Sequence, residues 1–138
     1  MNKPNIIIVE NDVDEQLFMQ EGFTESGLFH ILAVAKNGEE LFERLQEKEL
    51  LLPDLILSDL NMPGKNGYDI LKEIKADERL AHIPVAITST SSIAPVIDKC
   101  LSLGACCFLQ KPELFIEYAT FAQKLLSAVQ EYIPVKEK

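Results

Sequence analysis

One carboxylate follows a short apolar run near the middle of the chain. Leu55-Ile56-Leu57 lies between Pro53 and the turn-forming segment Met62-Pro63-Gly64, and Asp59 stands two residues after the run. A run this short between helix breakers is typical of a buried strand rather than of a helix. Asp59 is then either a helix N-cap or turn residue, or a nucleophilic or metal-binding carboxylate at the end of a parallel strand. This stretch alone leaves both interpretations open.

Three other strand-like runs also end in polar side chains that could do chemistry. In chain order these are Glu10, Asn11 and Asp12 after the run at 5–9, Thr88 and Ser89 at the end of the run at 85–88, and Lys111 after the run at 105–109. If the strands are parallel, all of these side chains lie at one edge of the sheet, because right-handed crossovers bring the carboxyl ends of the strands together. In such open sheets the functional crevice lies outside those ends.

Hydrophobic periodicity and breakers outline the elements that must position these residues. We predict strands at about 5–9, 29–35, 55–57, 85–88 and 105–109, and helices at about 13–26, 38–49, 67–77, 93–103 and 113–132. Strands that alternate with helices predict an α/β fold with a parallel sheet covered on both faces. The apolar residues expected to share a helix side are Val13, Leu17, Phe18 and Phe23 in the first helix, and Phe115, Ala119, Ala122, Leu126 and Val129 in the last.

Together these strand-end residues predict phosphoryl chemistry. Carboxylates packed at one edge repel one another, and a hard divalent cation such as Mg²⁺ would balance them because it prefers carboxylate, carbonyl and water oxygens. With a metal ion and Lys111 nearby, Asp59 can stay ionised and attack a phosphoryl group. The phosphoryl oxygens could then be held by Mg²⁺, Lys111 and the hydroxyl of Ser89.

Composition limits the partners that the chain can have. The 138 residues carry a net charge of −9, with 13 acidic and 4 basic side chains in residues 1–60, so direct nucleic-acid binding is not expected. No apolar run approaches the roughly 18 residues that span a membrane. We therefore expect no membrane partner and a cytoplasmic location. The length predicts a single domain over 1–138, with its core at about 4–133 and a frayed polar tail at 134–138.

In this order the motifs resemble those of a response-regulator receiver domain of two-component signalling, the CheY-like family. The resemblance covers nearly the whole chain and rests on four motifs: the acidic cluster after Ile-Ile-Ile-Val, Asp59 within Ser-Asp-Leu-Asn-Met-Pro-Gly, Ser89 after the fourth strand, and Lys111-Pro112 after the fifth. It implies a doubly wound, flavodoxin-like fold of five parallel strands in the order 2-1-3-4-5 with five helices. It also implies a stand-alone phosphoprotein switch rather than an enzyme.

The resemblance implies a role for each matching residue. Asp59 is expected to be the phospho-acceptor. Mg²⁺ is expected to bind to Glu10, Asn11, Asp59 and the backbone carbonyl of Asn61. The phosphoryl group is expected to be contacted or sensed by Ser89, Phe108 and Lys111, and the peptide bond before Pro112 is expected to be cis. One position departs from the family's pattern, since the second acid of its metal-binding pair is Asn11 here. We expect weaker Mg²⁺ binding, because a neutral oxygen gives less Coulomb attraction, unless Asp12 substitutes through a shift of the loop.

The function that the resemblance implies is a two-state switch in a phosphorelay. A sensor histidine kinase or a histidine phosphotransfer protein would donate a phosphoryl group to Asp59, and the surface of the fourth helix, fifth strand and fifth helix would change for a downstream protein target. Two alternatives stay open: a phosphorylation-independent pseudo-receiver that acts as a binding module, and a Mg²⁺-dependent phosphoaspartate phosphatase. The absence of a well-placed general acid–base beside Asp59 counts against the phosphatase, and the presence of Ser89 and Lys111 counts against the pseudo-receiver.

Overall fold

The computed structural model describes residues 3–47 and 51–133, where strands and helices alternate along the chain. The strands are β1 Asn5–Val9, β2 His30–Ala35, β3 Leu55–Asp59, β4 Val85–Ser89 and β5 Cys107–Gln110. The helices are α1 Val13–Ser26, α2 Gly38–Gln46, α3 Gly67–Ala76, α4 Ala94–Ser102 and α5 Tyr118–Val129, with a short 3₁₀ helix, η1 Phe115–Glu117, just before α5. The tail predicted at 134–138 lies outside the described residues.

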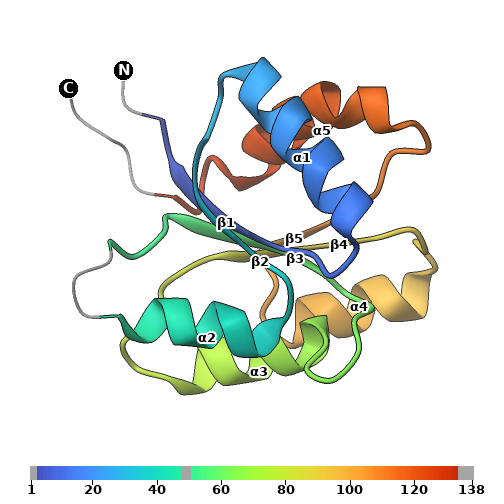
Figure 1. Cartoon of the computed structure of the whole chain (residues 1–138). Coiled ribbons are helices and arrows are strands. Elements are labelled where there is room, and N and C mark those ends of the chain that lie inside the picture. Colours follow the sequence, from blue (N-terminus) through green and yellow to red (C-terminus); the bar gives the residue numbers. More distant parts are fainter. Residues whose placement is uncertain (1–2, 48–50, 134–138) are drawn as a thin grey trace.

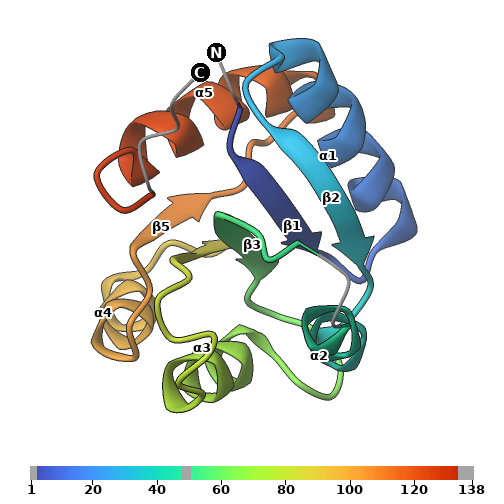
Figure 2. The ribbon, with the colours of Figure 1, turned by 90° about the vertical axis from the view of Figure 1, so that its left-hand side faces the viewer.

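The strands form a parallel sheet in the order β2-β1-β3-β4-β5, which confirms the predicted fold class and strand order. Helices α1 and α5 cover one face of the sheet, and α2, α3 and α4 cover the other, as both views of the ribbon show (Figures 1 and 2). This arrangement makes β1 and β3 neighbours at the centre of the sheet and leaves β5 at an edge. The ends of β1 and β3 therefore lie side by side, and a residue after β5 must reach across β4 to meet them.

The apolar β-branched run of β1 is buried on both sides because helices cover both faces of the sheet. Successive side chains of a strand point to opposite faces, so Ile7 and Val9 pack in the cluster under α2, α3 and α4, while Ile6 and Ile8 pack in the cluster under α1 and α5. All four side chains have no exposed surface. This packing holds the carboxyl end of β1 in place.

Side-chain caps begin α1, α2 and α3, the helices that follow β1, β2 and β3. Asn37 accepts a hydrogen bond from the backbone amide of Glu40 at 2.8 Å at the start of α2. Asn66 and Asp69 form a reciprocal capping box at the start of α3. Asp12 caps α1 by accepting from the amide of Glu15 at 2.9 Å. These caps set the backbone path of the loops beside the sheet edge.

The buried side of α1 agrees only in part with the predicted one, since Phe23 is buried and Phe18 is half-buried as expected. Met19 and Phe23 are fully buried, whereas Val13 is 76% exposed and Leu17 is 53% exposed. The reason is the close approach of α5 at Gly22, where an added Cβ atom would overlap the Cβ of Tyr118. Since positions three and four apart share a helix face, this approach turns the Met19-Gly22-Phe23 side of α1 inward.

The last helix begins later than predicted. Residues 115–117 form η1, and α5 then buries Tyr118, Phe121, Ala122, Leu125 and Val129. Phe115 is therefore 55% exposed rather than internal, and it stacks on Phe18 of α1 with ring centroids 4.4 Å apart. Val13 and Leu17 of α1 and Ile116 of η1 are also exposed, and we call the exposed apolar side chains of these two contacting elements the α1–η1 face. No helix in the described ranges is both long and apolar enough to cross a membrane.

Candidate functional site

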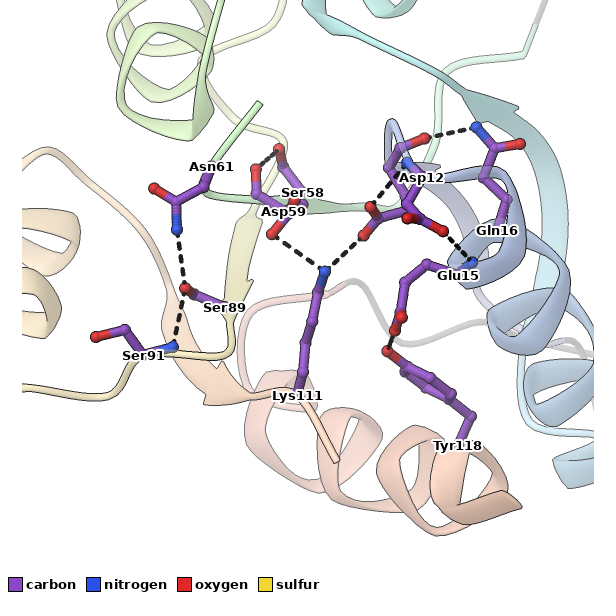
Figure 3. A network of polar contacts seen from close by, with 11 residues as sticks. Asp12, Glu15, Gln16, Ser58, Asp59, Asn61, Ser89, Ser91, Lys111 and Tyr118 are labelled. Atoms are coloured by element: carbon purple, nitrogen blue, oxygen red, sulfur yellow. Dashed lines mark hydrogen bonds and ion pairs between the residues drawn. The ribbon is translucent and has the colours of Figure 1, made fainter. Parts of the chain in front are cut away.

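Three of the predicted site residues meet at the carboxyl edge of the sheet. The ammonium of Lys111 lies 2.8 Å from Oε1 of Glu10 and 3.3 Å from Oδ1 of Asp59. Both acids are nearly inaccessible to solvent, with 1% of Glu10 and 5% of Asp59 exposed. Figure 3 shows Lys111 reaching from the end of β5 into this cluster. The order of the strands accounts for the meeting, because Glu10 follows β1, Asp59 ends its neighbour β3, and Lys111 follows β5 beyond β4.

One lysine is shared between two buried carboxylates, and this sets the electrostatics of the site. Burial raises the pKa of Glu10 and of Asp59, and the hydrogen bonds and charge of Lys111 only partly oppose that shift. For Lys111, burial acts against the charged form, but the hydrogen bond that its ammonium donates to Glu10 and the charge of Asp59 outweigh burial and raise the pKa of Lys111. The cluster thus holds more negative charge than its lysine can balance, which favours an added cation.

The hydroxyl of Ser89 connects two loops at the same edge. Ser89 is fully buried as the last residue of β4, whereas the sequence predicts it just after the strand. Its Oγ accepts hydrogen bonds of 3.2 Å from the side-chain amide of Asn61 and from the backbone amide of Ser91 (Figure 3). The loop after β3 and the loop after β4 are therefore both held by one hydroxyl group near Asp59.

The predicted metal ligands are only partly assembled. Among residues 3–47 and 51–133, no group of three His, Cys, Asp or Glu side chains is placed to hold a metal ion. Asn11 is exposed, and Oδ1 of Asp12 accepts a hydrogen bond from the amide of Glu15 at the start of α1. The oxygens that remain suited to a hard divalent cation are the Glu10 and Asp59 carboxylates and the carbonyl of Asn61. These donors, with their uncompensated negative charge, fit such an ion chemically.

Two further predictions concern residues on and after β5. Phe108 is half-buried and packs against the core under α2, α3 and α4. The predicted cis bond before Pro112 is wrong, since the described residues contain no cis peptide bond. The trans form is the ordinary state of an X-Pro bond. The backbone amide of Lys111 continues the ladder to the carbonyl of Ser89 at 2.9 Å, and the long lysine side chain reaches both acids from there.

Sequence reasoning missed two polar residues of α1 and one of α5 that border the site. The side-chain amide of Gln16 donates to the carbonyl of Glu10 at 2.6 Å. The hydroxyl of Tyr118 donates to the carboxylate of Glu15 (Figure 3), and burial followed by this bond raises the pKa of Tyr118. Glu15 and Gln16 lie one turn after the capping residue of α1, but no signal in the sequence pairs α1 with a tyrosine so far along the chain.

The assembled groups can support one kind of chemistry well. Asp59 presents a carboxylate at the edge of the sheet, Lys111 supplies a cation beside it, and Ser89 supplies a hydroxyl on a neighbouring strand. A carboxylate nucleophile next to a cation and a hydroxyl is suited to accept and stabilise a phosphoryl group, whose charge lies on its oxygens.

Comparisons with known proteins agree with this geometry. The family model for the response regulator receiver domain matches residues 6–119. The two-component response regulator ORR5 of Oryza sativa subsp. japonica is 32% identical over 109 residues, which cover 79% of this chain and 78% of ORR5. The two-component response regulator ARR5 of Arabidopsis thaliana is 41% identical over 75 residues, which cover 54% of this chain and 41% of ARR5. The chain thus spans about two fifths of the length of ARR5.

Solved structures share the fold over nearly the full length. The phosphorylated cyanobacterial phytochrome response regulator RcpA is 27% identical with a TM-score of 0.81, and the match covers 99% of this chain and 100% of RcpA. The Mn²⁺-bound form of the response regulator Rcp1 is 26% identical with a TM-score of 0.79, covering 97% of this chain and 99% of Rcp1. On the family match and the shared fold, the chain belongs to the response regulator receiver domain family of two-component signalling.

Proposed function

We propose that this chain is a phosphoacceptor switch and that Asp59 is the residue phosphorylated. The observation that carries the proposal is the buried cluster in which one lysine bridges Glu10 and Asp59 at the carboxyl edge of the sheet. A structural ion pair would need only one acid for Lys111. A second buried acid leaves negative charge that is stabilised only when further cationic groups bind, as phosphoryl transfer with a metal ion requires.

The proposed reaction transfers a phosphoryl group from a phosphohistidine to Asp59. A carboxylate oxygen of Asp59 forms the new bond to phosphorus as the bond between phosphorus and the imidazole nitrogen breaks, and the imidazole leaves with the bonding electron pair. Lys111 is close enough to Asp59 to contact the transferred phosphoryl oxygens. The donor is a sensor histidine kinase or a histidine phosphotransfer protein, as expected for a receiver domain, and RcpA gives an example of a phosphorylated relative.

A divalent cation is part of the proposal, with Mg²⁺ as the expected ion. Glu10, Asp59 and the carbonyl of Asn61 would hold it, and Asn11 would add a neutral oxygen. When bound, the ion neutralises charge on the phosphoryl oxygens. The Mn²⁺-bound form of Rcp1 supports a divalent site in a relative. Because Asn11 lacks the family's charge, Asn11→Asp should bind Mg²⁺ several-fold more tightly by calorimetric titration. Equal or weaker binding by that variant would contradict the role of Asn11.

The proposed output is a change at the surface formed by α4, β5 and α5. A phosphoryl group on Asp59 would draw the hydroxyl of Ser89 toward it, which breaks the hydrogen bonds from Asn61 and Ser91. The half-buried ring of Phe108 then moves into the space that Ser89 leaves. This pair is the bistable element that converts a local charge into a changed surface for a downstream protein.

The test is the intact mass of the protein after incubation with Mg²⁺ and acetyl phosphate. We expect the wild type and Asp54→Asn, which removes an acid at the opposite end of β3, to gain one phosphoryl group. Asp59→Asn should gain none. A mass gain in Asp59→Asn would show that another residue accepts the phosphoryl group.

The exposed position of Asn11 favours one second candidate, a pseudo-receiver that binds partners without phosphorylation. The capping contact of Asp12 supports it further, because a shift of Asp12 to replace the missing acid would break the cap of α1. The same incubation separates the two functions. A folded wild type that gains no phosphoryl group with excess Mg²⁺, while Asn11→Asp does gain one, would establish the pseudo-receiver and identify Asn11 as the cause.

A further inference from the structure

Thr88 carries a buried hydroxyl group that the chain does not use in this structure. The residue is fully buried on β4, and its Oγ1 has no hydrogen-bond partner among the residues that the structure describes. A buried hydroxyl without a partner lowers stability, and valine would fill the same volume without that loss. A threonine at this position therefore needs an explanation other than packing.

The register of the sheet places Thr88 directly beside the phosphoacceptor. Thr88 pairs with Asp59 on β3 and with Leu109 on β5, and paired residues of parallel strands point to the same face. That face is the one covered by α1 and α5, because Ala86, two residues earlier on β4, packs in their core cluster. Ser89, one residue later, points to the other face. Asp59 therefore has a hydroxyl from β4 on either side of the sheet.

The path of Lys111 passes over the same position. Lys111 follows Leu109 by two residues, so its side chain leaves β5 on the face of Leu109 and Thr88. Its ammonium contacts Asp59 on β3 and Glu10 after β1, and β4 lies between β5 and both of these strands. The lysine side chain must therefore cross β4 at its carboxyl end, where Thr88 is the last residue of that strand on this face.

We infer that Thr88 is a positioning residue for Lys111, and that its hydroxyl accepts a hydrogen bond from the ammonium as Asp59 is phosphorylated. The inference rests on the proposed function. In the resting state the ammonium donates to Glu10 and lies within ion-pair distance of Asp59. With a divalent cation bound, Glu10 would serve as one of its ligands, and the bond to phosphorus would remove the full charge of Asp59. Lys111 then contacts the phosphoryl group, and Thr88 offers a buried acceptor to hold it there.

The test compares two substitutions that separate shape from hydrogen bonding. Thr88→Val keeps the branched shape and removes the hydroxyl, whereas Thr88→Ser keeps the hydroxyl. We expect Thr88→Val to unfold at the same or a higher urea concentration than the wild type, because it loses an unpaired polar group. Its rate of phosphorylation by acetyl phosphate with Mg²⁺ should nevertheless fall about fivefold, the change that a hydrogen bond worth about 1 kcal/mol implies. Thr88→Ser should phosphorylate at nearly the wild-type rate.

Each other outcome overturns a defined statement. A Thr88→Val chain that phosphorylates as fast as the wild type would show that the hydroxyl is not used. Equal slowing in Thr88→Ser would assign the effect to packing and overturn the inference as well. A wild-type chain that gains no phosphoryl group would overturn the proposed function first and the role of Thr88 with it, so the two failures are distinguished by the wild-type measurement.

Discussion

Removing the shared lysine of the site should destabilise the protein far more than removing a lysine from a closer ion pair at the surface. In Lys111→Met the methionine keeps most of the apolar stem but leaves Glu10 and Asp59 buried together without a cation. At an effective dielectric constant of about 20, charges at 2.8 and 3.3 Å attract by about 6 and about 5 kcal/mol. Desolvation of the buried ions offsets much of this attraction.

The net loss of stability in Lys111→Met depends on the two buried carboxylates that are left without a cation. Removing one partner of a buried ion pair typically destabilises by about 3–5 kcal/mol, because an uncompensated charge remains buried. Protonation of an acid relieves part of this loss, so we expect the free energy of unfolding of Lys111→Met to fall by about 3 kcal/mol near neutral pH. The loss should shrink as the pH is lowered toward the raised pKa values of Glu10 and Asp59.

Lys65→Met is the matched control. Lys65 lies only 2.6 Å from Glu73, closer than either contact of Lys111, but the two side chains are 28% and 46% exposed. Exposed pairs of this kind contribute about 1 kcal/mol or less, so the control should lose no more than that. Urea unfolding of both variants and the wild type, without divalent cations, measures the difference. Equal losses in the two variants would refute the argument that burial, and not distance, decides the strength of the site.

Three further results are expected. Gly22→Ala should lower the free energy of unfolding by about 2–3 kcal/mol in urea unfolding, because its Cβ would overlap Tyr118 where α1 packs on α5. The control Gln20→Ala, on the exposed side of α1, should change the free energy of unfolding by less than about 0.5 kcal/mol. A Gly22→Ala variant as stable as the wild type would contradict the close approach of the two helices. Asn37→Ala should lower the free energy of unfolding, measured in urea, by about 1 kcal/mol because the α2 cap is lost. Asn37→Asp keeps an acceptor oxygen and should be nearly as stable as the wild type. The folded-state pKa values of Glu10 and Asp59 lie above their ordinary values of 4.5 and 3.8, so the folded chain binds more protons than the unfolded chain between the ordinary and the raised values. The free energy of unfolding should therefore fall as the pH rises through this range. The fall should be smaller in Asp59→Asn, and an unchanged slope would refute the pKa shift of Asp59.

The sheet and its functional edge could be predicted because they follow from local signals. The apolar β-branched run of β1 and the Pro and Gly residues around β3 mark strands without reference to the rest of the chain. The parallel arrangement then brings Glu10, Asp59 and Lys111 to one edge by topology alone. The meeting of these three residues therefore needed no knowledge of side-chain conformations.

The parts that could not be predicted depend on how helices pack against one another. The buried side of α1 is decided by the approach of α5 at Gly22, and the sequence of α1 contains apolar residues on both sides. The start of α5 was missed because Phe115 has a helical spacing but serves to stack on Phe18. The bond between Glu15 and Tyr118 joins residues 103 positions apart, a distance over which local pattern carries no information.

The α1–η1 face has a consequence for how the protein behaves in solution. Val13, Leu17 and Ile116 are exposed on segments that contain acidic side chains and neither lysine nor arginine. Two copies that meet through this face bring like charges together along with the apolar side chains, so repulsion opposes their association. At an ionic strength of about 0.15 M the repulsion decays over about 8 Å, and at about 1 M over about 3 Å. Added salt should therefore promote self-association of this acidic protein, and dilute buffer should keep it monomeric.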